Sequence, residues 1–255
     1  MKLAEARVLL TGASGGIGTA MAEALQHQGA HVLGVSRSGQ TGSMAWAHAD
    51  LAHPDGVRSV AHAAQRWGAN VVVHAAGLPA FGPLVGTTPA LAAELLQTNL
   101  WAPMALTHAL LPHLLAQPQA RLVFVGSALG RIGVPGYSVY GASKAGLHSF
   151  AEALRRELLG TTTQVQMLAP RATRTAFNGA AAQHFATATG SASDSPERVA
   201  QELIALLESG AAERFIGWPE KALVRLNGAL GPWLDGGFSQ HRKVLFPAPM
   251  KGTTP

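Results

Sequence analysis

The sequence contains no cysteine, which excludes disulfide bonds and thiol chemistry. Charged residues make up only 13% of the 255 residues, and no apolar run reaches the roughly eighteen residues that a membrane-spanning helix needs. The first ten residues include Glu5 and Arg7 and lack the apolar core of a secretion signal. We therefore expect a cytoplasmic protein without a membrane span.

Aromatic residues are also scarce, at 6%, and no block of five lysines or arginines occurs. The net charge of +5 therefore does not indicate nucleic acid; it suits phosphate-bearing cofactors and acidic substrates. The eleven histidines show no H-E-x-x-H spacing, so no metal site is expected. The sequence GSALG at 126–130 lacks the spacing of a hydrolase nucleophile elbow, which argues against a serine hydrolase.

A glycine-rich turn follows the first apolar run. Residues 7–10 suit a buried parallel strand, and a helical pattern begins near Ile17. Between them the sequence TGASGGIG places glycines at 12, 15, 16 and 18. Such a turn lets the backbone approach a pyrophosphate, which binds the N–H groups of the first helical turn. We interpret the segment as a dinucleotide-binding turn, and the alternative is a flexible loop.

Tyr140 and Lys144 are four residues apart in a predicted helix and therefore share one face. A lysine cation beside a tyrosine favours the phenolate and is expected to lower the tyrosine pKa. A tyrosine tuned in this way can exchange a proton at neutral pH. Ser127 precedes Tyr140 by thirteen residues, at the end of an apolar strand. Alone, the Tyr-Lys spacing also fits an ordinary solvated helix surface.

Strands and helices alternate along the chain. We expect strands at 7–11, 31–36, 44–49, 70–74, 121–126, 163–168 and 213–216, and helices at 16–28, 55–67, 88–97, 99–116, 138–159 and 196–209. This alternation predicts an α/β fold, a doubly wound (Rossmann) parallel sheet of about seven strands with helices on both faces. Residues 1–238 are expected to form a single domain ending in an amphipathic helix, and 239–255 a loose tail.

Taken together, these motifs resemble the short-chain dehydrogenase/reductase family, in its non-extended branch, over roughly residues 6–218. The motifs in order are the glycine turn, Asp50, the sequence HAAG at 74–77, Asn99, Ser127, Tyr140 and Lys144. The resemblance implies an oxidoreductase that interconverts a carbonyl and an alcohol. It assigns catalysis to Asn99, Ser127, Tyr140 and Lys144. Tyr140 would donate the proton, Ser127 stabilise the carbonyl oxygen, Lys144 bind the ribose and Asn99 maintain a proton relay.

The resemblance also implies a nicotinamide dinucleotide cofactor, whose nicotinamide end Thr175 would bind. The residues expected to bind it are Gly12, Ser14, Gly15, Gly16, Ile17, Gly18, Ser36, Arg37, Ser38, Asp50, Leu51, Ala75, Ala76, Gly77, Tyr140, Lys144, Pro170, Thr173 and Thr175. No carboxylate occurs between Glu23 and Asp50, where the ribose of NAD would need one. Arg37 can instead grip a 2′-phosphate, which favours NADP(H), unless it is merely a solvated loop residue.

Three residues depart from the family pattern. His74 and Ala75 stand where relatives usually have two asparagines, and Arg171 follows Pro170 where relatives usually have glycine. We expect His74 to replace a lost asparagine hydrogen bond. We expect the backbone at Arg171 to adopt a conformation open to a side chain. Asp50 could alternatively cap the following helix.

The sequence also carries indications of the assembly and of the substrate. The helices at 99–116 and 138–159 carry more leucine than one sheet face needs, and in relatives such helices pair into dimers or tetramers, so we expect a homodimer or homotetramer. The tail is predicted to form an amphipathic helix whose apolar face carries Leu223, Leu226, Leu230 and Trp233. This face could pack on the core, cover the substrate entrance, meet another subunit or contact a membrane peripherally.

The expected lid, residues 176–195, has few charges and suggests an apolar ketone or 3-oxoacyl-type substrate. The alternative function is a non-catalytic NADP(H)-binding regulator.

Overall fold

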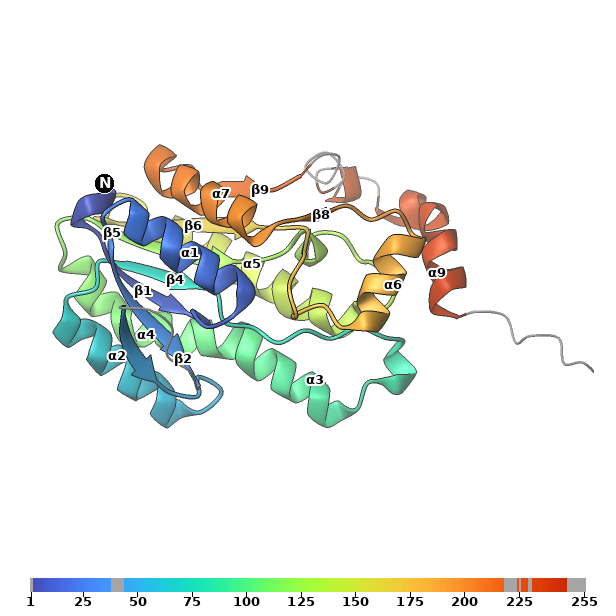
Figure 1. Ribbon diagram of the computed structural model, residues 1–255, viewed down its shortest axis with the longest axis horizontal. Helices are drawn as coiled ribbons and strands as arrows, with labels where there is room; N and C mark the ends of the chain where they lie inside the picture. The colour runs from blue at the N-terminus through green and yellow to red at the C-terminus, as the bar shows by residue number, and fades with distance from the viewer. Residues whose placement is uncertain (1, 38–43, 218–223, 225, 229–230, 247–255) are drawn as a thin grey trace, which may run out of the picture.

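The computed structural model describes residues 2–37, 44–217, 224, 226–228 and 231–246. Its centre is a seven-stranded parallel sheet of order β3-β2-β1-β4-β5-β6-β9 (Figure 1). The strands are β1 (Arg7–Thr11), β2 (His31–Ser36), β3 (Ala45–His48), β4 (Val71–His74), β5 (Ala120–Val125), β6 (Thr163–Ala169) and β9 (Glu213–Phe215). The predicted fold class and strand positions are confirmed.

Helices cover both faces of the sheet (Figure 1). They are α1 (Gly16–His27), α2 (Pro54–Trp67), α3 (Pro89–Leu96), α4 (Ala102–Leu115), α5 (Ser138–Glu157), α6 (Ala180–Ala188), α7 (Pro196–Ser209) and α9 (Ser239–Leu245). Met21, Leu25, Leu203 and Leu206 belong to the core cluster on the α1 and α7 face. Leu106, Leu110, Leu147 and Leu154 belong to the cluster on the face of α2, α4 and α5. Strands buried on both faces explain the continuous apolar runs of the sequence.

The strand order places the ligand crevice. From β1 the chain adds β2 and β3 on one side of the sheet, and β4, β5, β6 and β9 on the other. The order therefore reverses between β1 and β4. In open α/β sheets, ligands bind outside the carboxyl ends of the strands at this reversal. The glycine turn leaves β1 here, and the segment after His74 leaves β4.

The predicted helices 88–97 and 99–116 are one helical stretch with an irregular turn. α3 continues through a π-helical turn, η3 (Gln97–Trp101), into α4. Asn99 lies in this turn and is fully buried. Single π turns inside helices are frequent at functional sites, which agrees with the catalytic role that the family resemblance implies for Asn99.

The end of the chain differs from the prediction. Residues 218–223, 225, 229 and 230, which hold much of the predicted amphipathic helix, lie outside the described residues. Gly231–Phe238 forms a 3₁₀ helix, η5, in which the Trp233 side chain is 87% exposed and therefore does not belong to the core. Ser239–Leu245 is α9, so the prediction of a loose tail from residue 239 is wrong for this part. Gln240 Nε2 donates to Ala188 O across 2.9 Å, which ties α9 to the end of α6.

Candidate active site

One cavity of about 920 Å³ lies at the carboxyl ends of the strands. All the sequence-predicted cofactor residues line it except Ser38, which lies outside the described residues. Ser127, Tyr140 and Lys144 line it as well, whereas Asn99 is buried behind its wall. The segments that follow β1, β2, β3, β4, β5 and β6 therefore meet at the place where the strand order reverses. Among the described residues, no three histidine, aspartate or glutamate side chains gather as metal ligands.

The glycine turn is held against the end of β4. Gly12 has a φ of 68°, and a Cβ added there would lie 2.8 Å from the Cα of Ala76. A side chain at position 12 would therefore be strained and would collide with the backbone. Thr11 Oγ1 accepts hydrogen bonds from the N–H groups of Ala75 and Ala76, both at 3.0 Å. These contacts leave the backbone of the turn open to the cavity, as pyrophosphate binding requires.

The turn also contacts the segment after β6. A Cβ added to Gly16 would lie 2.7 Å from Thr175 Cγ2. The methyl group of Thr175 thus occupies the space that a side chain at position 16 would need. The phosphate end and the predicted nicotinamide end of the cofactor site are in direct van der Waals contact.

The end of β2 supplies Arg37, whose side chain is exposed and lines the cavity. Ser36 beside it is buried. Asp50 Oδ1 accepts a hydrogen bond from Ala52 N at 2.9 Å, but α2 begins at Pro54 with His53 as its N-cap. Asp50 is therefore not the helix cap that the sequence left as an alternative. No other arginine or lysine of the described residues lines this end of the cavity.

Tyr140 and Lys144 project from the first turns of α5. Tyr140 is half-buried and forms a hydrogen bond with Ser127, which follows β5. Burial raises the pKa of Tyr140 to about 12, and the bond with Ser127 lowers it only in part. Burial lowers the pKa of Lys144 to about 8, and its Nζ donates to Val125 O at 3.0 Å. The expected lowering of the Tyr140 pKa by Lys144 is not found: burial raises the pKa, and Lys144 Nζ lies 5.9 Å from the ring centroid.

Asn99 connects the π turn to the catalytic helix. Its Oδ1 accepts from Leu78 N at 2.7 Å, and its Nδ2 donates to Leu78 O at 3.0 Å and to Ser143 Oγ at 3.2 Å. Ser143 Oγ in turn donates to Tyr140 O at 2.7 Å. Asn99 therefore fixes both the cavity wall at Leu78 and the backbone of Tyr140.

His74 takes over a bracing role, as expected. Its Nε2 lies 3.0 Å from Thr107 Oγ1 on α4, and its ring stacks on Phe124 with centroids 4.8 Å apart. Burial lowers the pKa of His74 to about 3, so the imidazole is neutral at neutral pH. His74 thus braces the sheet against α4 and does not line the cavity.

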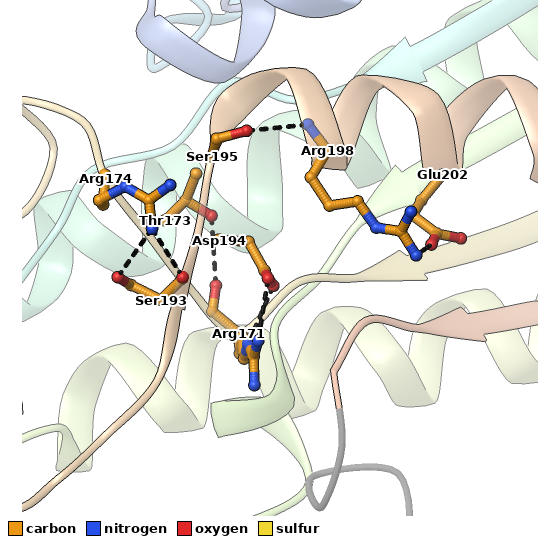
Figure 2. Close-up of polar contacts among 8 residues, drawn as sticks. All are labelled: Arg171, Thr173, Arg174, Ser193, Asp194, Ser195, Arg198 and Glu202. Carbon is orange, nitrogen blue, oxygen red and sulfur yellow. Dashed lines mark hydrogen bonds and ion pairs between the residues drawn. The ribbon is translucent and has the colours of Figure 1, made fainter.

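Arg171 lines the cavity and pairs with Asp194 (Figure 2). No described non-glycine residue has a positive φ, so the backbone at position 171 accepts a side chain without strain, as expected. Arg171 Nε and Nη2 lie 3.0 Å from the two carboxylate oxygens of Asp194. No local sequence pattern predicts this partner, which is distant along the chain and adjoins α7.

An aromatic cluster forms the wall beyond Tyr140. The ring centroid of Phe81 lies 5.0 Å from that of Tyr137 and 4.9 Å from that of Phe185. Phe185 also contacts His241 of α9, at 5.6 Å between centroids. The predicted lid residues Phe177 and Phe185 line the cavity, whereas His184 is exposed outside it. Sequence reasoning missed Phe81, Tyr137 and His241, although Tyr137 stands three residues before Tyr140, on the same side of the helix start.

The family model for short chain dehydrogenases matches residues 6–185, and the chain belongs to this family of oxidoreductases. The uncharacterized oxidoreductase YbbO of Escherichia coli K12 is 32% identical over 189 residues, which cover 69% of each chain. The ketoacyl reductase HetN of Nostoc sp. is 36% identical over 178 residues, 64% of this chain and 62% of that protein. The match thus spans about three fifths of the length of HetN. The 3-oxoacyl-[acyl-carrier-protein] reductase FabG of Vibrio cholerae is 31% identical over 64% of this chain and 71% of its own.

Solved structures show the same fold. A short chain dehydrogenase from Burkholderia cenocepacia in complex with NADP superposes with a TM-score of 0.82 at 22% identity, over 94% of this chain and 99% of that one. A second one from that organism, also in complex with NADP, has a TM-score of 0.75 at 27% identity, over 87% of this chain and 100% of that one. The helices within the described part of the chain are too short or too polar to cross a membrane.

Proposed function

We propose that the protein is an NADP(H)-dependent oxidoreductase that interconverts a carbonyl and an alcohol. The observation that carries this proposal is the meeting of Tyr140 and Ser127 at the cavity wall, with Lys144 beneath them and the glycine turn at the other end. The contacts at Gly12 and Gly16 leave a side-chain-free cradle of the kind that a pyrophosphate fills. The residues present therefore fit a dinucleotide.

NADPH, when bound, supplies the hydride that reduces the carbonyl carbon. Tyr140, whose raised pKa keeps it protonated at neutral pH, donates its hydroxyl proton to the carbonyl oxygen. Ser127 Oγ hydrogen-bonds to that oxygen and orients it. Lys144 binds the cofactor ribose, and Asn99 maintains the proton relay that reprotonates Tyr140. In the reverse direction the same phenol must first lose its proton, so alcohol oxidation should be favoured by alkaline pH.

The choice of NADP(H) rests on Arg37. Its guanidinium stands at the end of β2 where a 2′-phosphate would lie, and a carboxylate there would repel that phosphate. Two structural relatives were solved in complex with NADP, which supports the same choice.

The substrate is an apolar ketone or a 3-oxoacyl-type compound. The wall beyond Tyr140 consists mainly of aromatic and alanine side chains from the 79–81 segment, α5, α6 and α9. Burial lowers the pKa of His241 in this wall, so it adds no fixed charge. The names of two relatives, a ketoacyl reductase and a 3-oxoacyl reductase, agree with this class. We further propose that the protein is cytoplasmic and forms one catalytic domain.

The test is NADPH oxidation with a panel of ketones and 3-oxoacyl thioesters, using Tyr140→Phe as the matched variant. The variant keeps the ring and should still bind NADPH, but its turnover should fall about 10²–10⁴-fold, since it lacks the general acid. Ketone reduction by Tyr140→Phe at the wild-type rate would contradict this role. NADPH binding without turnover of any carbonyl by the wild type would favour the non-catalytic regulator instead.

A further inference from the structure

Two short strands lie side by side, and the residues of the first one line the cavity wall. β7 (Ala172–Thr173) follows β6, and β8 (Ser193–Asp194) precedes α7, and the two pair in parallel. Arg174 N donates to Asp194 O at 2.9 Å, and Arg174 Nη1 donates to Ser193 O at 2.9 Å. Figure 2 shows these residues on adjacent segments. Residues 174–192, which contain α6, therefore form a loop whose two ends are joined.

An ion pair locks this junction. The Arg171 guanidinium contacts both oxygens of the Asp194 carboxylate at 3.0 Å (Figure 2). The two side chains are only 18% and 12% exposed. A bidentate, largely buried pair is stronger and more directional than a surface ion pair. We use the term clasp for β7, β8 and the Arg171–Asp194 pair.

The clasp is joined to α7, which packs against α1. Ser195 follows Asp194 directly, and its Oγ accepts a hydrogen bond from Arg198 N at 3.2 Å as the N-cap of α7 (Figure 2). α7 packs along α1, and α1 begins at the glycine turn. The carboxylate that holds Arg171 is thus fixed relative to the phosphate end of the cofactor site.

The clasp holds Thr175, which is expected at the nicotinamide end, and Thr173, which is expected to bind the cofactor. Thr173 belongs to β7, and its Oγ1 donates to Arg171 O at 3.3 Å. Asn178 Nδ2 donates to Thr173 O at 2.8 Å, and Phe177 N donates to Thr175 Oγ1 at 3.3 Å. Thr175 contacts Gly16 of the turn. A shift of β7 would therefore move Thr173 and Thr175 together.

We propose that Arg171 and Asp194 are positioning residues: their ion pair holds the loop that carries Thr173 and Thr175 in place to receive the nicotinamide end of NADP(H). The inference rests on the proposed function, because it assigns that end of the cavity to the nicotinamide. It explains why this chain tolerates an arginine after Pro170. The side chain adds a link between β6 and α7 that a glycine could not make.

The experiment compares Arg171→Gln, Asp194→Asn and the double variant with the wild type. The matched control is Arg214→Gln, which breaks the ion pair of Arg214 Nε on β9 with Glu202 Oε2 on α7 at 2.7 Å, and neither residue lines the cavity. NADPH dissociation constants are measured by fluorescence. Amide hydrogen exchange of residues 172–194 is measured without cofactor. Melting temperatures report on overall stability.

Each clasp variant should weaken NADPH binding about 5- to 150-fold, the range of a coupling between linked sites. The double variant should bind NADPH no more weakly than the single variants do, since either change alone breaks the same ion pair. Exchange in residues 172–194 should accelerate in the clasp variants and not in Arg214→Gln. KM for NADPH should rise more than kcat falls.

NADPH affinity within twofold of wild type in the clasp variants, with a melting temperature lowered as in Arg214→Gln, would overturn the inference and leave a purely structural pair. Unchanged exchange in residues 172–194 would overturn it as well. If the wild type binds no dinucleotide, the proposed function fails by itself. The exchange measurement then still shows whether the ion pair holds the loop.

Discussion

His74 Nε2 and Thr107 Oγ1 lie 3.0 Å apart in the core, where they join the end of β4 to α4. The imidazole is 4% exposed and stays neutral, with its pKa lowered by burial to about 3. In the unfolded chain the same group has a pKa of about 6.5. Acid therefore favours the unfolded state, which takes up the proton first. The stability that neutral His74 contributes is complete above pH 6.5 and is lost as the pH falls towards 3.

We expect His74→Asn to reduce this acid sensitivity. Between pH 7 and pH 5 the wild type should lose about 2 kcal/mol of unfolding free energy through His74 alone. The asparagine variant lacks this loss, although His148, with its pKa lowered by burial to about 4, keeps a dependence of the same sign. Urea denaturation at several pH values measures the slope.

Thr107→Val is the control for His74. It removes the hydrogen-bond partner but keeps the imidazole, so it should lower stability and leave the pH slope unchanged. Equal slopes for His74→Asn and the wild type would show that this histidine does not govern the acid sensitivity.

Asn99→Ala should lower both the unfolding free energy of the protein and the turnover of the enzyme. The change removes three hydrogen bonds, two to the Leu78 backbone and one to Ser143. We expect a loss of about 2–4 kcal/mol in unfolding free energy, since backbone groups lose their partners. Turnover should fall, because Leu78 and Tyr140 lose a common support. Chemical denaturation and steady-state kinetics measure the two effects.

Asn70→Ala provides the comparison for Asn99. Asn70 Oδ1 accepts from Arg7 N at 2.9 Å at the opposite end of the sheet. It should reduce stability without reducing turnover of the remaining folded enzyme. If both variants lost turnover equally, Asn99 would have no special connection to the site.

Arg37→Asp should reverse the preference between the two cofactors. NADPH binding should weaken by about 1.5–3 kcal/mol, the scale of a charge-assisted hydrogen bond. NADH should bind equally well or better, because the carboxylate can accept from the ribose hydroxyls. Arg66→Asp, on the exposed face of α2 and outside the cavity, has the same change in charge and serves as the control. Wild-type protein that bound NADH as tightly as NADPH would refute the NADP(H) assignment.

We expect at least a homodimer through α4 and α5. Four leucines of these helices cannot contribute to the interface, because their side chains are at most 1% exposed and face the core: Leu106, Leu110, Leu114 and Leu147. Met104 and Leu115 remain 38% and 40% exposed on one stripe of α4. Light scattering at micromolar concentration should give a mass of at least twice 26.4 kDa.

Met104→Glu with Leu115→Glu should dissociate this dimer, whereas Val85→Glu, at a residue 92% exposed in another segment, should not. A monomeric wild type would refute the interface. A dimer that survived the paired substitution and charge reversals along α5 would place the contact elsewhere, for example at the tail.

The sequence was sufficient for the parts of the fold that local patterns encode. The apolar runs gave the strands, and the glycine turn with Tyr140 and Lys144 gave the ends of one cavity. Contacts between distant segments left no local pattern: Asp194 gives no sign that it will meet Arg171. The pKa of Tyr140 could not be predicted from its spacing to Lys144, because the spacing does not report how much water burial removes.

The tail shows a second limit. Its leucines and Trp233 follow a helical period, but Trp233 is exposed and η5 is a 3₁₀ helix. Two glycines, at 236 and 237, and Pro232 disfavour a regular α-helix there. The packing of α9 onto α6 through Gln240 and His241 depends on a polar bond and one ring contact, which hydrophobic periodicity does not register.

The π turn at Gln97–Trp101 means that this helix contains one residue more than continuous α-helical bonding would use. The site therefore depends on the length of the chain as well as on its side chains. Deletion of one residue of the turn would let α3 and α4 join as a regular helix whose two parts keep nearly the same faces, because the π turn takes up the extra residue within a single turn. A shortened chain would thus keep its fold and the faces of both helices, yet lose the widened turn from which Asn99 reaches Leu78 and Ser143.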